Sequence, residues 1–158
     1  MPEPFLPRKD SLGYQVNHLA RLLAHALRDR IEPLGVAPGQ FAQLLALYET
    51  DGLTQAALCE RVQVEQPTMA NTLARMERDD LITRVPDPLD RRRSLVWLTQ
   101  RARDVEPALV AAAREVNTRA TQGLTNHQVA ALMSTIAAAI ANLNTDNASA
   151  PPRQEDQS

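Results

Sequence analysis

Four arginines and two aspartates lie within the ten residues from 84 to 93. Arginine also supplies nearly all of the positive charge of the chain, because Lys9 is its only lysine. A guanidinium is a planar fork that suits bidentate contact to a phosphate or to guanine. This stretch therefore predicts a concentrated site for phosphate contact. The four arginines are Arg84, Arg91, Arg92 and Arg93.

Two strand-like segments, 81–85 and 95–99, flank a proline-containing loop over 86–93. Their apolar and β-branched residues predict a hairpin with a basic tip. Asp90 and Arg92 are two residues apart, so on an extended strand they would share a face and could pair. The alternative is a solvated loop whose charges only keep the protein soluble.

Two helices are predicted immediately before this hairpin. Residues 54–61 form a short amphipathic pattern, 62–64 form a turn, and 65–78 form a longer helix with an apolar stripe on one side. Two helices at a sharp angle followed by a hairpin make a winged helix-turn-helix, which places one helix in a DNA major groove and the loop in the minor groove. The sequence therefore predicts binding to double-stranded DNA.

The longer helix has a polar side that could read bases. Asn71 is our preferred adenine reader, since Asn and Gln pair bidentately with adenine, while Arg pairs with guanine and Thr meets a thymine methyl. A solvated helix face is the alternative. The predicted DNA-binding residues of the two helices are Thr54, Gln66, Pro67, Thr68, Asn71, Thr72 and Arg75.

The order and spacing of these motifs resemble the multiple-antibiotic-resistance-repressor (MarR) family over about residues 11–143. Residues 87–92 (Asp-Pro-Leu-Asp-Arg-Arg), followed by a strand that ends Leu98-Thr99, are similar to the wing of that family. Residues 66–69 and 73–77 are similar to its recognition helix. The chain departs from the family where Asn71 replaces a basic residue and Ala70 a hydroxyl residue.

The resemblance implies an α-helical homodimer that binds a palindromic operator and often releases it when a small molecule or an oxidant arrives. It also implies that Asp90 aims Arg92 into the minor groove. The remaining arginines of the wing would then meet phosphates; these are Arg84, Arg91 and Arg93.

The rest of the chain predicts a mainly α fold. Residues 1–10 are expected to be a flexible arm, 11–143 a single domain, and 144–158 a disordered tail. Within the domain, the winged helix spans about 37–99, and dimerisation helices span about 11–34 and 100–143. Pro107 is expected to kink the first helix after the wing or to mark a restart. The helices at both ends carry apolar stripes too long for the small winged core to cover, which predicts a homodimer.

Composition limits the function further. The net charge of −2 counts mildly against a nucleic-acid binder, although basic residues gather in the wing. No apolar run reaches membrane-span length, and a single cysteine fits a reducing compartment, so we expect a cytoplasmic protein. We expect no enzyme activity and no cofactor, because the chain contains no nucleophile–base pattern, phosphate-cradling loop or metal cluster.

Other residues suggest weaker hypotheses. Cys59 occupies an apolar helical position, where cysteine is usually a small core residue, and a redox-sensing regulator is the alternative. Four residues could line a cleft for a small aromatic or phenolic effector, with plain packing as the alternative; these are Tyr14, His18, Phe41 and Tyr48. A helical protein–protein adaptor is a further alternative, although an arginine-rich tip has no obvious use on an apolar docking surface.

Overall fold

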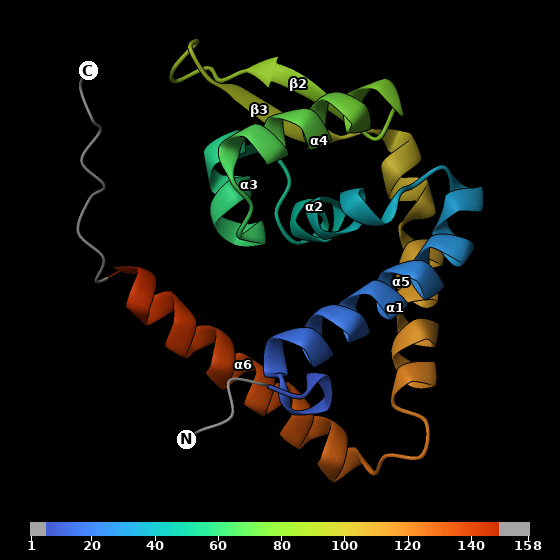
Figure 1. Cartoon of the computed structure of the whole chain (residues 1–158). Coiled ribbons are helices and arrows are strands. Elements are labelled where there is room, and N and C mark those ends of the chain that lie inside the picture. Colours follow the sequence, from blue (N-terminus) through green and yellow to red (C-terminus); the bar gives the residue numbers. More distant parts are fainter. Residues whose placement is uncertain (1–5, 149–158) are drawn as a thin grey trace. The chain divides into compact units, whose positions relative to one another are not determined.

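The computed structural model describes residues 6–148, with side chains through residue 145. The chain divides into two compact parts, residues 1–120 and 121–158. The first part contains most of the described helices and a small antiparallel sheet, and the described residues of the second part contain one helix (Figure 1).

The first part begins with one 3-10 turn, Arg8–Asp10, inside the arm that the sequence predicted to be flexible. Ser11 caps helix α1 (Leu12–Ile31), because its hydroxyl accepts a hydrogen bond from the Tyr14 amide. It packs against α5 (Gln100–Ala120), where Arg30 pairs with Glu115 at 2.9 Å. Gly35 adopts a φ of 75° after the short turn Glu32–Leu34, and this left-handed conformation ends the helical run.

The winged helix-turn-helix follows in the predicted order. Helices α2 (Pro38–Glu49), α3 (Gln55–Val62) and α4 (Gln66–Arg78) precede the hairpin of β2 (Ile82–Pro86) and β3 (Ser94–Leu98). The hairpin runs along α4 through β2, and its strand β3 also contacts α2 and α3 (Figure 1). The structure thus places the predicted recognition helix beside the wing.

The sheet contains a third strand that the sequence did not predict. Strand β1 (Leu53–Thr54) pairs antiparallel with β3, giving the order β1-β3-β2. Two residues are too short for an alternating pattern, so only the pairing with distant β3 makes them a strand. In the hairpin, Arg84 lies opposite Val96.

The core lies between the helices and the inner face of the sheet. The apolar side of α4 is fully buried, as predicted, through Met69, Leu73 and Met76. These side chains pack in one cluster with buried residues from α1, α2, α3, the sheet and α5. Burial of this stripe fixes which side of α4 remains exposed.

Helix α5 runs without interruption through Pro107, where the sequence predicted a kink or a restart. Proline removes one backbone hydrogen bond within a helix. Leu109, Ala112 and Val116 follow it on the buried face, and their packing keeps the helix continuous beyond the proline.

The second part contains α6 (Asn126–Ala148). Thr125 and Gln128 form a reciprocal cap: Thr125 Oγ1 accepts from the Gln128 amide at 3.2 Å, and Gln128 Oε1 accepts from the Thr125 amide at 2.8 Å. The helix continues five residues beyond the predicted end at 143, since 144–148 contain neither proline nor glycine. The rest of the predicted tail, 149–158, lies outside the described residues, as do residues 1–5 of the arm. Among the helices that the structure describes, none is both long and apolar enough to cross a membrane.

Candidate nucleic-acid interface

The outer face of α4 is polar and accessible. All its predicted base-reading residues are exposed except Thr72, which is half-buried and donates a hydrogen bond to the Thr68 carbonyl at 2.9 Å. Within the described part of the chain, the Asn71 and Arg75 side chains form no hydrogen bond or ion pair. Their donors and acceptors are therefore available to a ligand.

The N-terminal ends of α3 and α4 are joined by polar contacts. Gln55 Nε2 donates to Gln66 Oε1 at 2.9 Å, so part of the Gln66 amide is already engaged. Thr54 caps α3, because its hydroxyl accepts from the Ala57 amide at 3.2 Å. Helix N-termini attract anions, and phosphate is the anion that DNA presents.

The C-terminal end of α4 is anchored to the rest of the first part. Gln40 donates to the Asp79 carboxylate at 2.8 Å, and Arg101 donates to the Asp79 carbonyl at 2.9 Å and to the Leu34 carbonyl at 3.0 Å. The hydrogen bond from Gln40, assisted by Arg78 and Arg101, lowers the pKa of Asp79 below its ordinary value. These contacts hold the recognition helix at a fixed position against α2 and α5.

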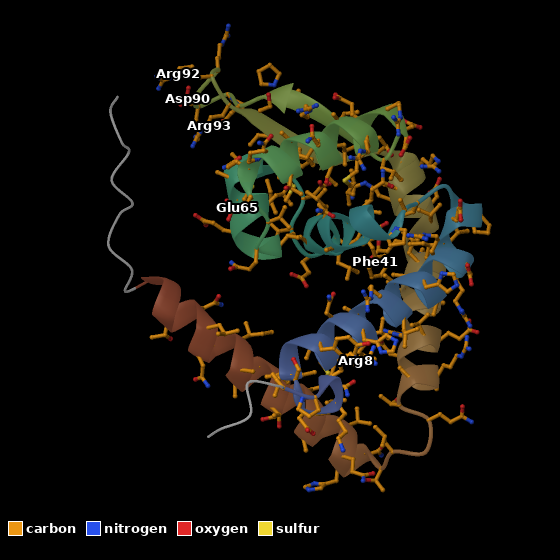
Figure 2. All side chains as sticks on the ribbon, in the orientation of Figure 1. Arg8, Phe41, Glu65, Asp90, Arg92 and Arg93 are labelled. Carbon is orange, nitrogen blue, oxygen red and sulfur yellow. The ribbon has the colours of Figure 1, made fainter. Side chains whose placement is uncertain are left out.

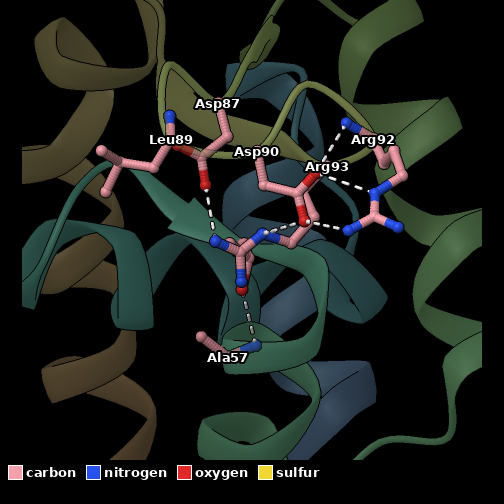
Figure 3. A network of polar contacts seen from close by, with 7 residues as sticks. Ala57, Asp87, Leu89, Asp90, Arg92 and Arg93 are labelled. Carbon is pink, nitrogen blue, oxygen red and sulfur yellow. Dashed lines mark hydrogen bonds and ion pairs between the residues drawn. The ribbon is translucent and has the colours of Figure 1, made fainter.

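The hairpin tip carries Asp90, Arg92 and Arg93 (Figure 2). Asp90 accepts hydrogen bonds from the backbone amide and Nε of Arg92, each at 3.1 Å. These bonds, with the charge of Arg93 nearby, lower the pKa of Asp90. The predicted Asp90–Arg92 pair is therefore present, and Figure 3 shows it from close by.

The reason given for this pair was wrong. Asp90 and Arg92 do not lie on an extended strand: the Arg93 amide donates to the Asp90 carbonyl at 2.9 Å, which closes a turn. In this turn the carboxylate of the first residue accepts from the backbone amide two residues later, as aspartate often does. The pairing thus comes from turn geometry and leaves the Arg92 side chain 90% exposed.

Asp87 is a functional candidate that the sequence reasoning missed. This carboxylate is buried, with a residue exposure of 5%, and accepts from the Leu89 amide at 2.9 Å and from the Arg93 guanidinium at 3.0 Å. Its position between Pro86 and Pro88 was the available signal, because an aspartate in a proline turn often bonds the backbone two residues on. Arg93 is therefore held from inside the loop by two aspartates.

Arg84, which the sequence predicts to meet phosphate, is paired within the protein. Its Nη2 and Nε donate to Oε2 of Glu77 on α4 at 2.8 and 3.2 Å. Register explains this, since Arg84 shares the inner face of the hairpin with the buried Ile82 and Val96 and therefore points toward α4. As the structure stands, Arg84 links the wing to the recognition helix.

The structure brings several predicted residues into one hollow of about 330 Å³ between α3, α4 and the wing. Asn71, Arg75 and Arg91 do not line it, and Arg91 borders a separate hollow beside Pro86 and Pro88. The candidate interface therefore consists of the exposed face of α4 and, next to it, the hollow between α3, α4 and the wing, which we call the cradle. The predicted residues that line the cradle are Thr54, Gln66, Arg84, Arg92 and Arg93.

Comparison with known proteins identifies the fold. The sequence profile of the MarR family matches residues 34–93, from the end of the turn Glu32–Leu34 through the wing tip. Over these residues the chain is similar to the MarR family. The mainly α, winged helix-turn-helix fold predicted from the sequence is confirmed.

Individual relatives and solved structures extend this match. The transcriptional regulator HosA of Escherichia coli O111:H- is 37% identical over 93 residues, an alignment that covers 59% of this chain and 64% of HosA. The chain thus spans less than two thirds of the length of that relative. PcaV of Streptomyces coelicolor, a transcriptional regulator solved with its natural ligand, has a TM-score of 0.78 and 26% identity, covering 86% of this chain and 96% of PcaV. The repressor CouR, solved bound to a 23-mer DNA duplex, has a TM-score of 0.71 and 26% identity, covering 84% of this chain and 94% of CouR.

The four residues predicted to line an effector cleft have different environments. Tyr14 and His18 are exposed and lie with ring centroids 6.1 Å apart. Phe41 packs against the core, and the Tyr48 hydroxyl donates to the Ala102 carbonyl at 2.7 Å. Burial, and secondarily the charge of Glu106, raises the pKa of Tyr48 to about 12. The hydrogen bond of Tyr48 therefore links α2 to α5.

Cys59 is half-buried on α3 and packs against the core. Burial raises the pKa of its thiol, and the negative charge of Glu65 acts in the same direction. A redox sensor reacts through its thiolate, which a raised pKa disfavours at neutral pH. This environment fits the packing interpretation of Cys59.

Proposed function

We propose that this protein is a transcriptional regulator that binds a palindromic DNA operator as a homodimer and represses the adjoining promoter. The observation that carries the proposal is the exposed polar face of α4, where Asn71 and Arg75 have no partner among the described residues. Beside it lies a wing whose Arg91 and Arg92 are exposed. Base edges in a major groove would engage the helix, and the adjacent minor groove would receive the wing.

The net charge of −2 makes the location of the basic residues important. Glu77 neutralises Arg84, and Asp87 and Asp90 neutralise part of the wing. Non-specific attraction to phosphate should consequently be modest, and specific contacts should supply more of the affinity than in a strongly basic protein. We therefore expect a large difference between the operator and random DNA.

The test is selection of bound sequences from random DNA, followed by affinity measurements on the selected site over a range of salt concentrations. A palindromic consensus and a steep loss of affinity with salt are expected, because each phosphate contact releases a counterion. A protein–protein adaptor would not bind DNA, so the selection would give no consensus sequence and no salt dependence could be measured. That result would overturn the proposal.

The proposal of a homodimer rests on the helices at the two ends of the chain. On α1 and on α6, each taken by itself, large apolar side chains are exposed, among them Leu19 and Leu22 on α1 and Ile136 and Ile140 on α6. Soluble monomers rarely leave contiguous apolar stripes in water. A second copy of the chain would cover them.

Substitution on α6 tests the dimer. Ile136→Glu places a charge within the apolar stripe and should dissociate or unfold the dimer, because an unpaired charge is costly to bury. Ser134→Glu is the matched control, since Ser134 is exposed on the opposite side of the same helix and its substitution should leave the dimer intact. If sedimentation showed a folded wild-type monomer at micromolar concentration, the proposal of a homodimer would be contradicted.

Release by an effector is the last part of the proposal. PcaV has been solved with a natural ligand, which supports a small-molecule response in this relative of similar fold. Adding small aromatic or phenolic acids to the operator complex should identify a compound that releases the protein. Peroxide should not release it if Cys59 is a packing residue. We also propose that the protein acts in the cytoplasm, where the chromosome of a bacterium lies.

A further inference from the structure

Leu89 at the tip of the wing is the most exposed large apolar side chain of the described residues, with 92% of its surface accessible. A single exposed leucine is ordinary on a protein surface. Leu89 differs in its setting, because it projects from a loop between Pro88 and Asp90, and exposed arginines follow directly in the chain. The DNA contacts proposed for α4 and for the arginines of the wing do not involve it.

The backbone at Leu89 is fixed by contacts inside the loop. The buried Asp87 carboxylate accepts from the Leu89 amide, and its other oxygen accepts from the Arg93 guanidinium. The Asp87 amide in turn donates to the Arg93 carbonyl at 2.9 Å, which closes the base of the loop. The leucine is consequently presented at a set position, so that ordering it on a partner costs less entropy than ordering a free loop.

The two sides of the loop differ in chemistry. Leu89 points away from the aspartate–arginine network, and Arg92 lies on the other side of it (Figure 3). The tip therefore has an apolar side and a cationic side, separated by Asp87, Asp90 and Arg93.

We propose that Leu89 is an apolar DNA contact, which packs against the deoxyribose wall of the minor groove while Arg92 faces the opposite wall. This inference rests on the proposed DNA binding and adds a residue that confers affinity without charge. Residues 87–93 carry three arginines and two aspartates, a net charge of +1, and a minor groove offers both negative potential and apolar sugar atoms within a narrow space. An apolar protein surface is a poorer partner for the tip. It would pack against Leu89, but it would remove water from the neighbouring guanidinium groups without offering them hydrogen-bond acceptors.

The test compares Leu89→Ser with Val85→Thr, measured on the selected operator at several salt concentrations. Val85 is an exposed apolar residue of β2, away from the tip, and is therefore the matched control. Leu89→Ser should weaken binding about tenfold at every salt concentration, with an unchanged salt slope, because an apolar contact releases no counterion. Leu89→Met should restore most of the affinity, and Val85→Thr should bind like the wild type.

Footprinting locates the contact. Hydroxyl radicals attack sugars from the minor groove, so Leu89→Ser should lose protection at the sugars beneath the wing and retain protection of guanine N7 in the major groove. Binding of Leu89→Ser within twofold of the wild type, or unchanged sugar protection, would overturn the inference. Failure of the wild type itself to bind DNA would instead contradict the proposed function.

Discussion

The recognition helix and the wing differ in how far their DNA-contacting side chains are ordered before DNA binds. On α4, Asn71 and Arg75 have no hydrogen-bond or ion-pair partner in the described part of the chain, so their side chains are free until a ligand selects a conformation. In the wing, Asp87 and Asp90 hold Arg93 and Arg92 before any ligand arrives. Ordering a long side chain costs conformational entropy, and a partner inside the protein reduces that cost at binding.

The difference suggests a division of roles. Free amide and guanidinium groups in a major groove can discriminate among base pairs, since each pair presents a distinct pattern there. The minor groove carries little sequence information, so a pre-positioned arginine loses nothing by being rigid. We therefore expect α4 to supply specificity and the wing to supply affinity and register.

Removing the free amide of α4 should give the largest effect. Asn71→Ala should reduce the preference for the operator by about 1–3 kcal/mol and flatten base preference at one position of each half-site. Affinity for random DNA should hardly change. The measurement is binding to the operator, to operators changed at single positions and to random DNA. Equal weakening on all of them would show that Asn71 does not read a base.

Removing the carboxylate that holds Arg92 should give a smaller loss. Asp90→Ala makes the wing more positive, which favours binding, and frees Arg92, which opposes it. If positioning dominates, operator affinity should fall about fivefold.

A double-mutant cycle isolates the positioning effect of Asp90. Asp90→Ala/Arg92→Ala should be little weaker than Arg92→Ala alone, because the carboxylate has no role without its arginine. Tighter binding by Asp90→Ala at physiological salt would leave Arg92 as one more phosphate contact.

Arg91 and Arg93 should differ although they lie in one loop. Arg91 is exposed and forms no ion pair among the described residues, whereas Arg93 contacts Asp87 and Asp90. Arg91→Ala should therefore weaken binding to all sequences and make the salt slope shallower by about one. Arg93→Ala should change the slope by less than half as much. Equal salt slopes for the two variants would show that the ion pairs of Arg93 do not reduce its contact with phosphate.

Loss of the Asp79 contacts that anchor α4 should lower the free energy of unfolding. Among the changes proposed here, it should have the smallest effect on operator affinity. The pKa of Asp79 is lowered in the folded protein, so its ionised form stabilises the fold. This contribution is complete above its ordinary pKa of 3.8 and disappears as pH falls through the lower folded value. Asp79→Asn should be destabilised by about 0.5 kcal/mol at pH 7.

Urea unfolding of wild type and Asp79→Asn at pH 7 and in strong acid tests this prediction. The difference between the two proteins should shrink in acid, because the wild-type carboxylate is then protonated. A difference that persisted unchanged in strong acid would show that hydrogen bonding alone, without ionisation, anchors the helix.

The sequence by itself determined the features that depend on local periodicity. The apolar stripe of α4 follows from residues three and four apart, and its burial leaves the polar side outward. The wing could be predicted as a basic loop between two strand-like segments. The Asp90–Arg92 pair was also within reach, because its members are two residues apart, although the turn that forms it was not recognised.

Only the tertiary structure decided which charges are free. Arg84 is held by Glu77 because strand register turns it inward, and Gln40 reaches Asp79 across 39 residues of sequence. Strand β1 exists only because β3 lies beside it. A one-dimensional pattern records the type and spacing of side chains along one element. Ion pairs between elements depend on how those elements pack, and packing is set by burial of the whole core.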